Sequence, residues 1–170
     1  MNRLFLASII LFSGLFSSVS AQEIGAYAFT RTPKLMNYNF GSKQVSYSHG
    51  VSAGLGLYRK NSFIELATFV FEGNTYGYYT FFGSTLKNTD LGNAFSIKTN
   101  WFGEITSLPS QGEIIDPTWI YTTGMCLLPN VQIQKFNIGI ALCSGLAYQS
   151  QSLNFNNRFI LNLSYGLTRN

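Results

Sequence analysis

Apolar and polar residues alternate with a period of two over most of the chain. The clearest run covers residues 159–167, where every odd-numbered residue is a large apolar or aromatic one. A second run covers residues 45–57, in which valine, leucine, tyrosine and histidine alternate with serine and glycine. This period predicts β-strands with two chemically different faces, and no segment after residue 21 shows a convincing helical period.

The alternation predicts about eight strands along the chain. They cover residues 23–30, 45–57, 63–71, 75–85, 94–106, 119–127, 138–148 and 159–168. The predicted connections are 31–43, 59–61, 72–74, 87–92, 107–117, 129–130 and 150–157. Long polar connections at 31–43, 107–117 and 150–157 alternate with short ones, a rhythm typical of outer-membrane barrels, in which the longer loops face outward.

The first 21 residues differ from the rest and predict an export signal. A positive start at Arg3 precedes an apolar run over residues 4–16, which is too short to span a membrane, and small residues at Val19 and Ala21 fit a cleavage site. We therefore expect a signal peptide over residues 1–21 and a mature domain over residues 22–170. The alternating segments are then placed outside the cytoplasm.

Composition narrows the class of protein further. Charged residues make up 11% of the chain, whereas soluble domains usually carry about 25%. Aromatic residues make up 16%, which favours strands over helices. Eleven Lys and Arg, less Arg3, against seven Asp and Glu leave a mature net charge of +3. The basic residues form no stripe, so nucleic acid is excluded as the expected partner.

The second face of the strands indicates where the sheet lies. At residues 46–56 and 139–147 this face carries serine, glycine, alanine and cysteine, with hardly a charge. A soluble sheet would carry lysine and glutamate there, whereas small residues fit the narrow interior of an eight-stranded barrel. The predicted fold is all-β, a single up-and-down antiparallel transmembrane β-barrel of about eight strands. The alternative is a soluble extracytoplasmic β-barrel that binds a small apolar ligand.

The alternation also predicts which way several residues point in this barrel. Glu65, Lys98 and Glu104 would point into the lumen and form an ion network there. Large aromatic residues on the opposite face would form the girdles at the membrane interfaces. These are Tyr47, Trp101, Trp119, Tyr121 and Tyr165.

Cys126 and Cys143 are the two cysteines of the chain, an even count in an oxidising compartment. Both fall on the small-residue face of neighbouring predicted strands. A disulfide between them is expected if the turn lies near Gln134 and Lys135. A turn at residues 129–130 would put the two cysteines out of register, and two free thiols are the alternative.

With these features, the chain resembles the small outer-membrane β-barrel proteins of the OmpA and OmpX type. The resemblance covers the whole mature chain and is one of pattern. It implies an integral protein of the outer membrane of a Gram-negative-type bacterium, without enzymatic activity, whose outer loops have a structural or surface-interaction role. It also implies contact with outer-membrane lipid and with the β-barrel assembly machinery. The surface partner is left open, and the C-terminus departs from the pattern by ending Leu167-Thr168-Arg169-Asn170.

Some small barrels of this type modify lipid A through a histidine, a serine and a carboxylate, which gives a second functional hypothesis. His49 is the single histidine, and Ser46, Ser48 and Ser52 lie nearby on the opposite face of the same predicted strand. The carboxylates are spread over several strands and loops, at Glu65, Glu72, Glu104, Glu113 and Asp116. No spacing supports a triad or a metal motif. We therefore expect no catalytic residues, no metal and no cofactor.

Overall fold

Eight strands form the protein, which we describe from a computed structural model covering residues 24–72, 75–110, 113–149 and 151–168. The expected signal peptide lies outside these described residues. The strands are β1 (Gly25–Asn39), β2 (Gln44–Arg59), β3 (Ser62–Phe71), β4 (Thr75–Asp90), β5 (Phe95–Ser110), β6 (Glu113–Ile133), β7 (Phe136–Gln149) and β8 (Ser152–Gly166).

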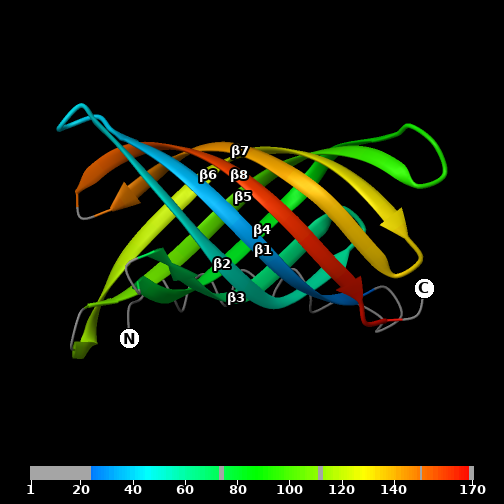
Figure 1. Ribbon diagram of the computed structural model, residues 1–170, viewed down its shortest axis with the longest axis horizontal. Helices are drawn as coiled ribbons and strands as arrows, with labels where there is room; N and C mark the ends of the chain where they lie inside the picture. Colours follow the sequence, from blue (N-terminus) through cyan, green and yellow to red (C-terminus); the bar gives the residue numbers. More distant parts are fainter. Residues whose placement is uncertain (1–23, 73–74, 111–112, 150, 169–170) are drawn as a thin grey trace.

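The strands form one closed antiparallel barrel in chain order, so the predicted fold class is confirmed. Each strand pairs with its neighbour in sequence, and β8 pairs with β1 to complete the ring, for example at Thr30 and Leu163. Figure 1 shows the strands running obliquely along the barrel. Closure pairs the backbone all round the wall, which is the condition for crossing a lipid bilayer with strands.

The barrel has two different ends. At one, which we call the terminal end, β1 begins, β8 ends, and three turns lie at residues 60–61, 91–94 and 134–135. At the other, which we call the loop end, β1 and β2 are joined through residues 40–43. β3 is the shortest strand, with 10 residues, which matches the length needed to cross a bilayer. The other strands are longer and extend the wall beyond it.

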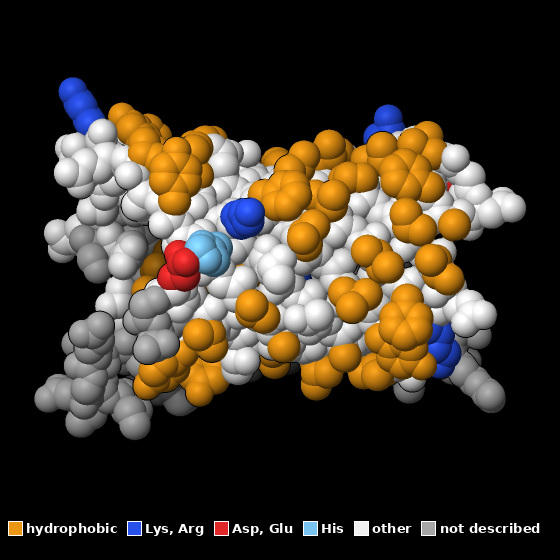
Figure 2. Space-filling view, in the orientation of Figure 1, with side chains coloured by type: hydrophobic (Ala, Val, Ile, Leu, Met, Phe, Trp, Pro, Cys, Tyr) orange, Lys and Arg blue, Asp and Glu red, His pale blue; other side chains and the backbone are white. Residues whose placement is uncertain are grey.

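The outer wall is apolar, and the inside of the barrel holds buried charges. Side chains that face outward include Leu55 and Leu66, each 61% exposed. Inside, Glu65 and Glu104 are 2% and 8% exposed. Figure 2 shows large apolar side chains over the wall from end to end. This distribution is the reverse of that in a soluble domain and fits a wall in contact with lipid. Among the described residues, no helix is long and apolar enough to cross a membrane.

The three predicted long loops are largely strand, which corrects the sequence interpretation. Residues 31–39 belong to β1, residues 107–110 and 113–117 belong to β5 and β6, and residues 152–157 belong to β8. These segments are polar in part because residues such as Arg31 and Asn154 face the lumen, where polar side chains are expected. Polarity was therefore a wrong signal for the end of a strand.

The predicted turn at residues 129–130 is also wrong, because β6 continues through Pro129 to Ile133. The pairing of β6 with β7 runs from Leu127–Leu142 to Asn130–Gly139 across this point. Proline lacks only its own N–H and is tolerated where one ladder bond is lost. The turn lies instead at residues 134–135, one of the two positions that the sequence left open.

Candidate functional site

The lumen contains a buried ion pair between β1 and β3. Arg31 donates from Nη1 to Glu65 Oε2 at 2.5 Å and from Nη2 to Glu65 Oε1 at 2.6 Å. The hydroxyl of Tyr27 donates to the same Oε1 at 2.6 Å, and Arg31 Nε donates to Asn162 Oδ1 at 2.8 Å. The side chains of Arg31 and Glu65 are only 14% and 3% exposed. The paired charges are thus satisfied by a bidentate contact and by neutral partners on both sides.

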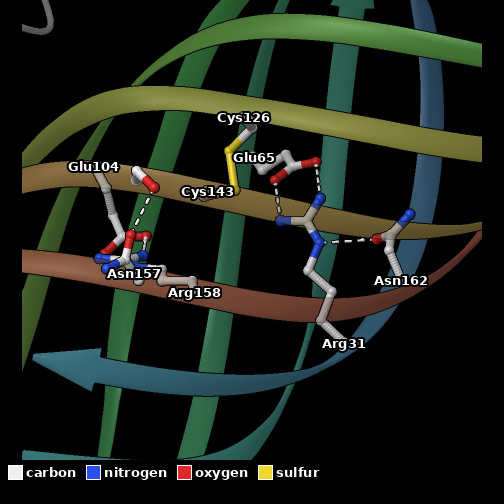
Figure 3. Close-up of a disulfide and its surroundings, with 9 residues drawn as sticks. Arg31, Glu65, Glu104, Cys126, Cys143, Asn157, Arg158 and Asn162 are labelled. Atoms are coloured by element: carbon white, nitrogen blue, oxygen red, sulfur yellow. Dashed lines mark hydrogen bonds and ion pairs between the residues drawn. A yellow bond between two sulfur atoms is a disulfide. The ribbon is translucent and has the colours of Figure 1, made fainter.

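A second ion pair joins Arg158 of β8 to Glu104 of β5 across the lumen. Thr106 donates to Glu104 Oε1 at 2.9 Å, and Arg158 Nη2 donates to Thr122 at 3.3 Å. Figure 3 shows the two ion pairs on either side of the disulfide. Both pairs connect strands that are not neighbours in the wall, and they therefore link parts of the barrel that the backbone ladder does not join directly.

The structure alters the predicted ion network of Glu65, Lys98 and Glu104. Both glutamates face the lumen as expected, but their partners are Arg31 and Arg158. Lys98 lies on the lumenal side of β5, and it has no ion pair within the described part of the chain. The two arginines were missed because Arg31 lies in a segment that was expected to be a loop, and Arg158 lies between the predicted loop 150–157 and the predicted strand 159–168.

Aromatic rings fill the middle of the barrel around these ion pairs. Phe81 stacks on Phe63 and on Phe102 with ring centroids 5.7 and 5.1 Å apart. Phe102 is 1% exposed, and it packs with Phe81, Cys126, Cys143 and Ile160 in one buried cluster. We call this cluster together with the two ion pairs the lumenal plug. The interior of an eight-stranded barrel is just wide enough to be filled by side chains such as these.

Cys126 and Cys143 form a disulfide inside the barrel, between β6 and β7 (Figure 3). They are directly opposite in the register, because the turn lies at residues 134–135. Both are buried, at 4% and 3% exposed. The disulfide therefore belongs to the lumenal plug.

Replacing both cysteines with serine is expected to lower the free energy of unfolding by about 3 kcal/mol, since the bond closes a short loop in the unfolded chain. The sequence separation is 17 residues. The measurement is urea unfolding of protein folded into detergent or vesicles, with the oxidised wild type as reference. Reducing agent should shift the wild type in the same direction and leave the serine variant unchanged. Equal stability of both forms would contradict the expectation.

The five aromatic residues predicted for the interface girdles all face outward, with exposures from 39% for Trp119 to 77% for Tyr47. Tyr47 on β2, and Trp119 and Tyr121 on β6, lie toward the loop end. Tyr165 lies at the terminal end of β8. Trp101 lies farther along the wall, where it pairs with Ser84 and Met125. A role in a girdle stays a prediction for each of them.

His49 lies on the outer wall and contacts Glu72, with Nε2 2.5 Å from Oε1. Both side chains are exposed, at 60% and 62%. Lys34 is the cross-strand partner of His49 on β1, so three polar side chains lie together in an apolar surface (Figure 2). Ser46, Ser48 and Ser52 are on the opposite face of β2, so the structure does not bring them to His49. Among the described residues, no group of three could hold a metal ion.

The terminal end of the lumen is open, in contrast to the plugged middle. A cavity of about 580 Å³ extends from the Arg31–Glu65 pair and the disulfide to the turn at residues 60–61. We call it the vestibule. Its wall includes Lys98 and Asn100 from β5.

No family model and no curated protein matches the chain. Solved structures do match. The neisserial surface protein NspA aligns with a TM-score of 0.52 at 6% identity, over 82% of this chain and 96% of its own. Ail of Yersinia pestis aligns at 10% identity over 84% and 99% of the two chains, with a TM-score of 0.39. The likeness to NspA shows the fold, a small barrel of the outer-membrane type.

Proposed function

We propose that the chain is an integral outer-membrane protein without enzymatic activity, a closed barrel that contacts partners at its loop end. The observation that carries the proposal is the inverted distribution of side chains, with leucines on the outside and two Arg–Glu pairs on the inside. A polypeptide of this kind is stable only where lipid or detergent covers the wall. Outer-membrane lipid and, during insertion, the barrel assembly machinery are its expected partners.

The lumenal plug supports a role other than transport. The Phe102 ring and the Arg158–Glu104 pair occupy the cross-section of the barrel between β5 and β8. A barrel of eight strands has an interior just wide enough to be filled by side chains. We therefore expect a folded barrel that conducts no steady ionic current.

The loop end offers a surface for partners because its rim is uneven. β3 ends at Phe71, which pairs with Gly50, so β2 continues from residue 49 to residue 44 without a β3 partner. A strand edge of this kind can accept a further strand from another chain through backbone hydrogen bonds. The exposed Val45 and Tyr47 on this edge would give such a contact its side-chain selectivity.

Labelling of introduced cysteines tests the membrane location and the orientation together. Lys43→Cys at the loop end is expected to react with a membrane-impermeant maleimide in intact cells. The matched variant Lys60→Cys, at the terminal end, should react only after the outer membrane is permeabilised. Recovery of the protein in the soluble fraction without detergent would rule out the membrane barrel, and the reverse labelling pattern would overturn the orientation.

The His49–Glu72 contact favours one other function, that of a lipid-modifying enzyme. A carboxylate that orients a histidine on the outer wall supplies two of the three members of a hydrolytic triad. The same cells supply the test, because lipid A can be extracted and its mass spectrum compared with that of cells producing His49→Ala. Identical spectra support the non-enzymatic proposal, whereas a lipid A species lost with His49→Ala would establish the enzyme.

A further inference from the structure

We propose that the vestibule is a binding site for a small organic anion that carries hydroxyl groups. The cavity is lined by the barrel wall and reaches the terminal end, where β8 ends and the turn at residues 134–135 lies. At about 580 Å³ it falls within the range of ligand sites in proteins. Its floor is formed by members of the lumenal plug, among them the Arg31–Glu65 pair and the disulfide.

The charge of the vestibule selects an anion. Its lining holds four basic side chains, Arg31, Lys60, Lys98 and Lys135, against the single carboxylate of Glu65. Arg31 and Glu65 neutralise each other, and Lys135 Nζ lies 5.9 Å from the outward-facing ring of Tyr165. Lys60 and Lys98 therefore leave an uncompensated positive charge in the lining. Lys60 and Lys135 lie in turns and are exposed, whereas Lys98 lies within β5 and is half-buried on its lumenal face. A partly buried ammonium group without a counterion is costly, and an anion from solution removes that cost.

Unpaired polar atoms in the same wall select hydroxyl groups. Asn100 lies two residues beyond Lys98 on the same face and is 9% exposed, yet its Oδ1 has no hydrogen-bond partner. Asn137 Oδ1, on β7 in the same vestibule lining, also lacks a partner, although its Nδ2 donates to Asn130 Oδ1 at 3.3 Å. Buried carbonyl oxygens nearly always accept a hydrogen bond. These two can accept from ligand hydroxyls.

The two sets of groups lie close enough for one ligand. Side chains two residues apart on a strand are separated by roughly 7 Å. A compound of sugar-phosphate size therefore reaches both the ammonium of Lys98 and the amide oxygen of Asn100. The anionic group would lie toward Lys98 and the hydroxyl groups toward the asparagines.

Glucose 6-phosphate is a suitable probe, with glucose and inorganic phosphate as its two halves. Binding to the protein folded in detergent micelles is measured by NMR titration. Glucose 6-phosphate is expected to give saturable shifts that include the Lys98 and Asn100 amides. Glucose alone and inorganic phosphate alone should each bind at least tenfold more weakly. Added salt should weaken the binding of glucose 6-phosphate more than that of glucose, because the contact to Lys98 is electrostatic.

Two variants decide the outcome, with a third as control. Lys98→Gln is expected to weaken the binding of glucose 6-phosphate at least tenfold. Asn100→Leu is expected to weaken the binding of glucose 6-phosphate and to leave the binding of inorganic phosphate unchanged. Lys87→Gln removes a lysine from the outward face of the neighbouring strand β4 and should change the affinity less than twofold. Heat-modifiable gel migration confirms that each variant is folded. The proposal is overturned if the probe does not saturate, or if Lys98→Gln binds it as wild type does.

Discussion

Glu65→Ala is expected to lower the free energy of unfolding by about 3–5 kcal/mol, because it leaves the Arg31 guanidinium buried without its counter-charge. The carboxylate accepts hydrogen bonds from two Arg31 nitrogens and from the Tyr27 hydroxyl. Its removal therefore frees three donors in the middle of the barrel. The measurement is the urea midpoint of the vesicle-folded protein, followed by tryptophan fluorescence.

Two control variants distinguish the effect of leaving a charge buried without a partner from the effect of losing any carboxylate. Glu72→Gln removes a glutamate whose contact with His49 is exposed, at 62% and 60%, and should cost about 0–1 kcal/mol. The double variant Arg31→Met, Glu65→Leu should be more stable than Glu65→Ala, because no charge is then left unpaired. If Glu65→Ala and Glu72→Gln were equally stable, Glu65 would not be desolvated in the folded protein.

Leu66→Arg is expected to make folding into vesicles less favourable by about 2–4 kcal/mol, the cost of an arginine at the lipid-facing midplane of a barrel. Leu66 is 61% exposed and lies in the middle of β3, the strand of 10 residues that just spans a bilayer. Its cross-strand partners are Leu55 and Thr80, which offer the guanidinium no acidic partner. The fraction that folds into vesicles, read by heat-modifiable migration, measures the effect.

The depth of the substitution provides the control. Val45 is 50% exposed at the loop end of β2, beyond the last residue of β3. Val45→Arg carries the same charge at or outside the interface and should cost about 0–1 kcal/mol. A soluble barrel would behave differently, since Leu66→Arg would then be close to neutral and would improve solubility. Equal effects of the two arginines would speak against a lipid-facing wall.

The sequence predicted the wall of the barrel better than its interior. Outward positions such as Leu161 and Leu163 repeat with a strict period of two, because lipid on one side imposes the same demand along the whole strand. That repeated demand makes strands visible from sequence alone. It also gave the correct strand number and the closed architecture.

The contacts inside the barrel depend on pairs of residues that are far apart in the chain, and no local sequence pattern shows such pairs. Arg31 and Glu65 lie 34 residues apart, and Arg158 and Glu104 lie 54 residues apart. Which charges meet depends on the register of strands that do not touch one another in the wall. Lys98 was therefore assigned to a network that the two arginines form. The signal that could have found Arg31 is its parity with Tyr27 and Phe29, had β1 been extended through residue 39. The matching signal for Arg158 is its parity with Ile160 and Asn162 on β8.

The pairing of β1 with β8 gives the barrel an uneven contact order. Seven of the eight strand pairings join neighbours in the chain, while Arg31 and Asn162 meet across 131 residues. The entropic cost of bringing distant segments together grows with their separation, so it is concentrated in this one seam. Hairpins can form early and independently, whereas the ring is complete only when the first and last strands meet. We expect closure of this seam to limit the rate of folding.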